Sequence, residues 1–179
     1  MKPVRPRYSR INTEVDRLLT SAKVRQPPVP VEKMAKDAGA KVVRNDFKEE
    51  VSGVLIRRDG TIVIGVATSQ SAERQRFTIA HELAHLLLHD GEEVHVDKMF
   101  RVNLRSQLSS KAEDVEEIEA NAFAASLLMP IGFLKADLQR VTLDIDDETQ
   151  VAKLAERYGV STQAMTYRLM NIFLPDRKS

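Results

Sequence analysis

The residues of this chain best suited to chemistry lie in one pentapeptide, His81-Glu82-Leu83-Ala84-His85. It is part of a run over 72–88 that lacks Pro and Gly and whose pattern predicts one helix. Residues four apart project from the same face of a helix, so both histidines can bind one metal ion. Glu82 lies about 100° farther around that helix, beside the ion, where a general base is expected. The spacing therefore predicts zinc-dependent hydrolysis.

A catalytic zinc site takes three protein ligands, so the chain must supply one more. The sequence has no cysteine, which leaves a carboxylate or one of the two other histidines. His89 lies too far along the helix axis to share an ion with His81 and His85. His95 could reach the ion by looping back. Acidic residues of a second helix, expected after a capping box at Ser110 and ending before Pro130, are the better source.

One face of that second helix combines a carboxylate with small side chains. Packing of the small residues would let the first helix approach closely and bring Glu117 to the metal, with Glu119 as the alternative ligand. Asn121 is a candidate for orienting the histidines. The face repeats at helical spacing through Glu117, Ala120, Asn121, Ala124 and Leu128.

Three segments resemble the ImmA/IrrE family of zinc metallopeptidases: RQRFTIAHELAHLLLH at 74–89, EIEANAFAA at 117–125 and LLMP at 127–130. The resemblance covers roughly residues 28–172. It implies that the zinc ligands are His81, His85 and Glu117, and that Glu82 is the catalytic base. Ala84 stands where many members have Gly, a small-for-small difference that leaves the site intact.

The same resemblance implies a fold and a biological role. The fold is α+β: a minimal zincin-like metallopeptidase core, with a small antiparallel sheet and active-site helices, followed by a helical C-terminal part. Members of the family are intracellular anti-repressors that cleave helix-turn-helix repressors, which implies a repressor of the XRE type here, and their genes often lie beside the repressor gene. We therefore expect a zinc endopeptidase with such a repressor as its protein partner.

The elements that must position the site can be read from the remaining pattern. An amphipathic helix is predicted over 9–22 and strands over 41–44, 51–57 and 61–66. The last two strands flank Asp59-Gly60, a hairpin signal, so a small antiparallel sheet is expected. The polar segment 92–109 resists assignment, although Met99 to Leu104 could be extended. The expected division is a metallopeptidase core with its N-terminal helix over 1–140 and a C-terminal helical region over 141–179.

The C-terminal region resembles a helix-turn-helix, with helices expected at 149–158 and 161–173 around Gly159. The second helix offers only a thin basic set for reading DNA. Packing or partner docking is therefore favoured, and direct DNA binding is the less favoured alternative. The set consists of Gln163, Thr166, Tyr167 and Arg168.

Charge, hydropathy and cysteine content indicate in which cellular compartment the protein is expected and whether it would bind a membrane. The chain has 27 Lys and Arg against 26 Asp and Glu, with basic ends around an acidic middle. No run approaches the roughly 20 apolar residues of a membrane span, so no membrane is expected as a partner. The absence of cysteine suits a reducing compartment, and a cytoplasmic protein is expected.

Two questions stay open at the level of sequence. Zinc itself, Tyr158, Tyr167, His95 or an arginine of 92–109 could stabilise the oxyanion. The alternative to the peptidase is a non-catalytic module that sequesters a repressor or binds DNA through the C-terminal helices. The sequence does not indicate the oligomeric state.

Overall fold

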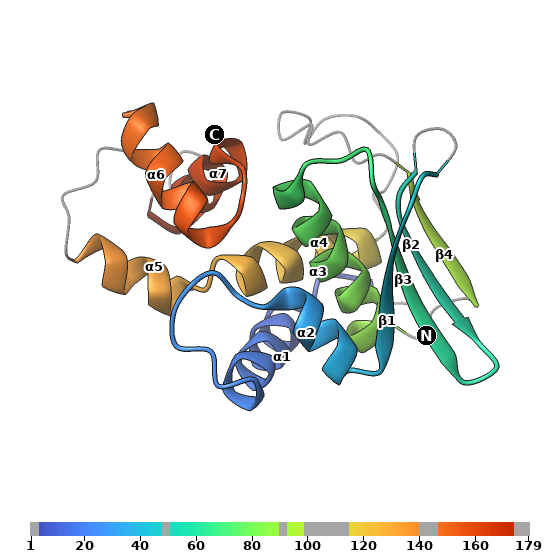
Figure 1. Ribbon diagram of the computed structural model, residues 1–179. Coiled ribbons are helices and arrows are strands. Elements are labelled where there is room, and N and C mark those ends of the chain that lie inside the picture. Colours follow the sequence, from blue (N-terminus) through green and yellow to red (C-terminus); the bar gives the residue numbers. More distant parts are fainter. Residues whose placement is uncertain (1–3, 48–50, 90–92, 99–114, 140–146, 174–179) are drawn as a thin grey trace.

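A computed structural model describes residues 4–47, 51–89, 93–98, 115–139 and 147–173, which form an α+β fold (Figure 1). A four-stranded mixed sheet stands at one end, and helices extend from it toward the C-terminal pair at the other. The elements are α1 (Tyr8–Ser21), α2 (Val31–Asp37), β1 (Ala40–Asn45), β2 (Val51–Arg58), β3 (Thr61–Ala67), α3 (Ala72–Leu88), β4 (Val94–Lys98), α4 (Val115–Leu128), α5 (Ile131–Leu138), α6 (Glu148–Tyr158) and α7 (Thr162–Phe173).

The sheet has the strand order β1-β3-β2-β4. β2 and β3 form the predicted hairpin, and Asp59 and Gly60 at its turn both have positive φ, 49° and 74°. The expectation of an antiparallel sheet is wrong for β1, which runs parallel to β3 with Ala40 opposite Ile62. An alternating side-chain pattern is the same in both strand directions, so the sequence carries no signal for this pairing.

The fourth strand, β4, falls in the acidic segment that resisted assignment. It pairs antiparallel with β2 and places the side chains of Val94 and Val96 on the outer side, 45% and 46% exposed. Pairing with β2, rather than apolar content, makes this segment a strand. The predicted extended stretch from Met99 and the capping box at Ser110 lie outside the described residues.

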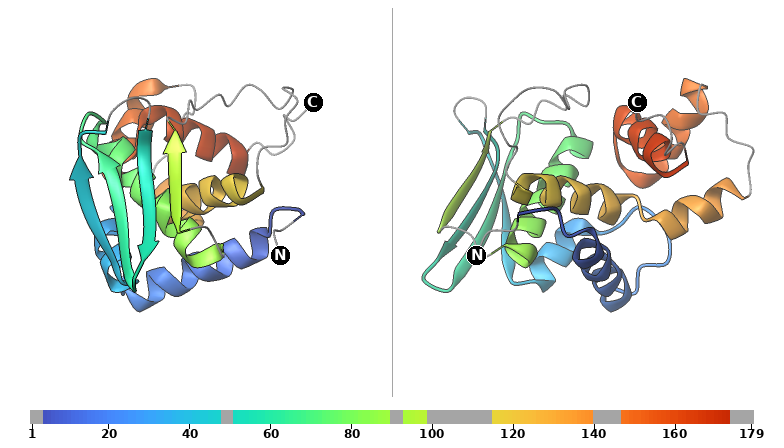
Figure 2. Two further views of the ribbon diagram at one scale, coloured as in Figure 1. Left: turned by 90° about the vertical axis from the view of Figure 1, so that its right-hand side faces the viewer. Right: turned by 180° about the vertical axis from the view of Figure 1, so that it is seen from behind.

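One face of the sheet packs against helix α3, and the helices lie on that side of it (Figure 2). Leu55 of β2 and Ile64 and Val66 of β3 are fully buried there. Gly53 of β2 also faces α3, and a Cβ atom at this position would lie 2.5 Å from Cγ2 of Thr78. The glycine lets strand and helix approach closely at the level of the pentapeptide.

Helices α3 and α4 pack through small side chains, as their sequences predict. Ala80 and Ala84 of α3 and Ala120 and Ala124 of α4 are all fully buried. Since alanine keeps two helix axes close, the acidic first turns of α4 are brought beside the histidines of α3.

Pro130 ends α4, and α5, which was not predicted, follows it. Among the described residues, no single helix has the length and apolar content to cross a membrane. Helices α4 and α5 taken together have that length and composition, but the chain bends by 42° between them.

The C-terminal helices α6 and α7 are joined through Gly159, whose φ of 63° ends α6 as predicted. Arg76 of α3 ties this turn to the rest of the fold: its Nε donates to the Gly159 carbonyl (3.0 Å) and its Nη2 to that of Val29 (2.9 Å). The pair therefore sits in contact with α3. The predicted division into 1–140 and 141–179 stays a prediction, since its boundary falls outside the described residues.

Candidate metal centre

Helix α3 presents His81 and His85 on one face, as the spacing predicts. Ser71 caps the helix by accepting a hydrogen bond from the Arg74 amide, and no residue within it interrupts the backbone ladder. Both histidines are buried, and their Nε2 atoms lie 3.1 Å apart. The two rings thus converge on one point.

Helix α4 adds Glu117 to this point. Its Oε2 lies 3.3 Å from Nε2 of His81, and its Oε1 lies 3.2 Å from Nε2 of His85. Glu119, the alternative carboxylate, is directed elsewhere and contacts Arg7 and His89. Of the two carboxylates considered from sequence, the fold therefore brings Glu117 to the histidine pair.

Strand β4 brings a third histidine, His95, to the same cluster. In the β2–β4 register His95 is opposite Leu55, which is buried against α3, so the two side chains share that face. Its Nε2 lies 3.4 Å from Oε1 of Glu117, and its ring centroid lies 4.0 Å from that of His85. Sequence reasoning retained His95 only as an alternative, because the strand that carries it was not recognised.

Glu82 is fully buried beside the cluster, on the side of α3 that faces β2. A Cβ atom at Gly53 would lie 2.8 Å from Oε1 of Glu82, so the β2 backbone passes directly over this carboxylate. Glycine at position 53 is what leaves room for Glu82.

Asn121 determines which nitrogen of His81 faces the cluster. Its Oδ1 lies 3.1 Å from Nδ1 of His81, and an amide oxygen can only accept a hydrogen bond. Nδ1 of His81 therefore carries the proton and donates it, which leaves the Nε2 lone pair directed at Glu117 and His85. This is the arrangement a metal-binding histidine requires.

A longer chain of contacts acts on His85. Its Nδ1 lies 3.1 Å from Nδ1 of His89, whose Nε2 lies 2.9 Å from Oε2 of Glu119. A carboxylate only accepts, so a neutral His89 ring donates from Nε2 and accepts at Nδ1 from Nδ1–H of His85. The lone pair on Nε2 of His85 is thereby directed at the cluster. Sequence reasoning assigned His89 no role beyond the helix end. It did not foresee this chain of contacts from Glu119 through His89 to His85, which we call the relay.

Arg7 anchors the far end of this relay. The backbone amide of Arg7 and its Nε donate to Oε1 of Glu119 at 2.6 and 2.9 Å, and its Nη2 donates to Oε2 at 2.6 Å. These hydrogen bonds lower the pKa of Glu119 to about 2, although burial opposes the charge. The carboxylate is thus held in its ionised form.

The ionisable groups of the cluster favour the states that metal binding requires. Burial lowers the pKa of His85 to about 4, against the opposing effect of its contact with Glu117. Burial also disfavours the charge of Glu117, but contacts with His81 and His85 outweigh it and hold the pKa of this carboxyl below its ordinary value. Near neutral pH the cluster therefore combines a neutral His85 imidazole with the Glu117 carboxylate.

The donor set fits a transition-metal ion. Ligand atoms of His81, His85, His95 and Glu117 all lie within 4.8 Å of one another. Ligands at about 2.1 Å in a tetrahedral shell are separated by about 3.4 Å, and four of the donor pairs in the cluster lie 3.1 to 3.4 Å apart. The Nε2 lone pairs of His81 and His85 are directed at each other and repel, and a cation bound between them would attract both.

The structure also locates the proposed oxyanion groups. The Tyr158 hydroxyl donates to Asp137 (2.8 Å), away from the cluster, and burial raises the pKa of this phenol above its usual value. Tyr167 lies on α7, where it lines a pocket together with Asn121 and Phe77. The arginines of 99–109 lie outside the described residues. His95 is the candidate that the fold brings into the cluster.

Comparison with known proteins adds family information to this geometry. Residues 35–170 match the IrrE N-terminal-like domain family (Peptidase_M78). The radiation response metalloprotease IrrE of Deinococcus deserti is 33% identical over 119 residues, which cover 63% of this chain and 39% of that protein. The chain therefore spans well under half the length of this relative.

A solved structure shares the fold. The Mycobacterium tuberculosis transcriptional regulator superposes with a TM-score of 0.61 over 96% of this chain and 49% of its own, at 20% sequence identity. At this identity the likeness concerns the fold alone.

Proposed function

Since this chain belongs to the IrrE N-terminal-like domain family, we propose that it is a zinc-dependent endopeptidase. One observation carries the proposal: donor atoms of His81, His85 and Glu117 converge, and Glu82 is buried beside them on the helix that carries the two histidines. A cluster made only of nitrogen and carboxylate donors suits zinc, which takes such ligands in catalytic sites.

In this proposal His81, His85 and Glu117 hold the metal. Zinc bound there would supply a Lewis acid that polarises a peptide carbonyl and makes water a better proton donor. The Glu82 carboxylate accepts a proton from the attacking water and then delivers it to the leaving amine. The confinement of Glu82 under Gly53 fixes this carboxylate, so little reorganisation is needed for the transfer.

His95 completes the proposed site from its open side. Its side chain is 28% exposed, whereas those of His81 and His85 are 2% and 4% exposed. A partly exposed imidazole at the edge of the cluster can reach a substrate carbonyl that the buried pair cannot. We assign it to stabilisation of the oxyanion and leave three protein ligands for the metal.

The proposed substrate is a helix-turn-helix repressor, cleaved in the cytoplasm so that its target genes are released. The family resemblance supports this assignment, and the Deinococcus deserti relative is named a radiation response metalloprotease, which fits a protease in a regulated response. The chain would then act as an anti-repressor.

The direct test pairs the purified chain with the repressor encoded by the adjoining gene. We expect about one equivalent of zinc by elemental analysis, and cleavage of the repressor by the wild-type chain but not by Glu82→Gln. Zinc should be retained in Glu82→Gln and lost in His81→Ala. Undiminished cleavage by Glu82→Gln would overturn the proposal.

The same experiment separates the peptidase from a non-catalytic module. A module that only sequesters a repressor would relieve repression equally well with Glu82→Gln. DNA reading by α7 receives little support from the geometry, since Gln163, Tyr167 and Arg168 of the basic set line a groove toward α4. A promoter-DNA shift lost with Gln163→Ala would restore that alternative.

A further inference from the structure

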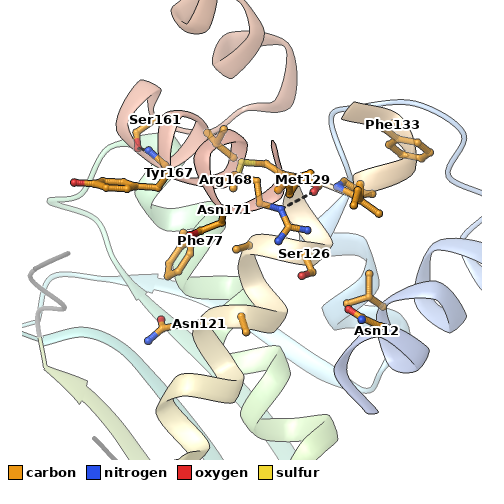
Figure 3. Close-up of a pocket in the computed structure, with 18 of the residues that line it drawn as sticks. Asn12, Phe77, Asn121, Ser126, Met129, Phe133, Ser161, Tyr167, Arg168 and Asn171 are labelled. Atoms are coloured by element: carbon orange, nitrogen blue, oxygen red, sulfur yellow. Dashed lines mark hydrogen bonds between the residues drawn. The ribbon is translucent and has the colours of Figure 1, made fainter. Parts of the chain in front are cut away.

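A groove with a volume of about 930 Å³ adjoins the metal centre (Figure 3). It is bounded by α1, the first turns of α3, one face of α4 and helix α7, and we call it the α4 groove. Its wall is largely apolar, with polar groups set into it. The residues used in the argument below are Asn12, Phe77, Asn121, Met129, Tyr167 and Arg168.

The α4 groove begins at the metal centre. Asn121, which lines it, is the residue whose Oδ1 contacts Nδ1 of His81. Phe77, which also lines the groove, has its ring centroid 6.3 Å from that of His81. A chain bound at the metal centre can therefore continue directly into the groove.

Arg168 places a positive charge inside this groove. Its Nε donates to the Met129 carbonyl at 3.2 Å, and Figure 3 shows the guanidinium lying over α4 among the lining residues. The side chain is half-buried, and burial lowers the pKa of this guanidinium. Among the described residues no carboxylate lies within ion-pair distance of it, so the charge is left without a counter-ion there.

The other charged residues of the groove differ from Arg168. Asp16 on α1 is exposed, where water and salt screen its charge. Glu73 lies at the N-terminus of α3, where hydrogen bonds to its own backbone amide and to Ser71 hold its pKa below the ordinary value. Arg74 lies over the Phe77 ring, with 5.7 Å between its Cζ and the ring centroid. Arg168 rather than Arg74 is therefore the arginine of the groove whose half-buried charge an added anion would stabilise most.

We propose that the α4 groove binds the substrate polypeptide on one side of the scissile bond and that Arg168 pairs with an acidic side chain of that polypeptide. This inference rests on the proposed peptidase function and adds a substrate preference to it. The apolar wall would contact the neighbouring substrate side chains, and Asn12 and Tyr167 would offer polar contacts to its backbone.

The geometry of α4 sets the position of the acidic residue. Asn121 marks the metal end of the groove and Met129 the position of Arg168, and eight residues of helix span about 12 Å. An extended polypeptide advances about 3.3 Å per residue. The acidic side chain should therefore lie about four residues from the cleaved bond.

A polypeptide fits this groove better than nucleic acid does. The wall is largely apolar and carries two arginines, Arg74 and Arg168, beside two carboxylates, Asp16 and Glu73, whereas nucleic acid requires a set of cations along its phosphates. One half-buried guanidinium matches a single carboxylate, with which it forms two parallel hydrogen bonds.

The test uses the zinc-loaded full chain and a pool of randomised 14-residue peptides, with cleavage sites read by mass spectrometry. We expect the wild-type chain to prefer Asp or Glu by about tenfold at one position about four residues from the cut. Arg168→Gln should abolish the preference, and Arg168→Glu should shift it to Lys or Arg. Arg157→Gln is the matched control, because it removes an exposed arginine of the neighbouring helix, outside the groove.

A second measurement keeps the two proposals distinguishable. Fluorescently labelled, zinc-loaded Glu82→Gln is applied to an array of the same peptides, alone and combined with Arg168→Gln. Arg168-dependent capture of acidic peptides supports the groove even if the wild-type chain cuts nothing, in which case the peptidase proposal alone fails.

Three results would overturn the groove proposal. The first is cleavage or capture without an acidic preference. The second is the same preference in Arg168→Gln, provided that its melting temperature matches that of the control. The third is a concentration-dependent dimer in sedimentation that Arg168→Gln dissociates, because the groove would then be occupied by a second copy of the chain.

Discussion

His89 and Glu119 are joined by a 2.9 Å contact between Nε2 and Oε2, both side chains being buried. Neither belongs to the His81–His85–Glu117 cluster, yet the contact determines which nitrogen of His85 faces that cluster. Arg7 holds Glu119 from a segment that precedes the family match at 35–170. The basic N-terminal head of the chain thus reaches the candidate metal centre through the side chains of Arg7, Glu119 and His89.

The relay predicts an effect on metal affinity. Glu119→Gln replaces an acceptor by an amide that can donate to Nε2 of His89. This favours the His89 tautomer with its proton on Nδ1, and that proton would face the Nδ1–H of His85. We expect zinc affinity to fall about 10- to 100-fold in a competition titration against a fluorescent chelator. Glu116→Gln, which removes the same charge from the same helix, should change it little. Equal affinities for the two variants would show that the relay does not orient His85.

The depressed pKa of Glu119 predicts a pH-dependent contribution to stability. Its pKa of about 2 in the folded chain lies below the ordinary glutamate value of 4.5, so the carboxylate stabilises the fold above about pH 5 and loses this effect as the pH falls toward 2. In metal-free protein, Glu119→Gln should lower the free energy of unfolding by on the order of 2 kcal/mol at pH 7. The difference from wild type, measured by urea unfolding, should shrink steadily below pH 5. A constant difference down to pH 3 would contradict the assignment.

Gly53→Ala tests the confinement of Glu82. The added Cβ would lie 2.8 Å from Oε1 of Glu82 and 2.5 Å from Cγ2 of Thr78, so the carboxylate or the strand must move. We expect a loss of about 1–3 kcal/mol in unfolding free energy and a fall in cleavage rate of more than about tenfold, with zinc retained. Gly132→Ala is the control for unfolding free energy, because the added Cβ would meet no atom within 4 Å beyond its chain neighbours and its own helix backbone. Full activity in Gly53→Ala would mean that the position of Glu82 is not critical.

His95→Gln distinguishes an oxyanion contact from a fourth ligand. If His95 contacts the substrate, zinc content should stay near one equivalent while kcat for a cleaved peptide falls about 100-fold. His81→Ala should instead lose the metal. Zinc content and cleavage measured on the same preparations give the answer. A loss of zinc in His95→Gln equal to that in His81→Ala would make His95 a ligand.

Some of this architecture follows from local sequence. The helix that carries the pentapeptide has the predicted bounds, because a capped run of helix-forming residues without Pro or Gly specifies its own hydrogen bonding. The Asp59-Gly60 turn formed as expected, since positive φ at these positions selects a tight hairpin. The small face of α4 likewise predicted close packing on α3, and with it the approach of Glu117.

Tertiary contacts decided the rest. The direction of β1 depends on which edge of β3 is available, and β4 becomes a strand only by pairing with β2, which turns His95 toward α3. The role of Glu119 depends on Arg7 and His89, and that of Arg168 on the face of α4 that it meets. Residue spacing along one helix records which side chains share a face. It carries no information about the partners that segments distant in sequence place opposite that face, because those partners depend on the packing of the whole chain.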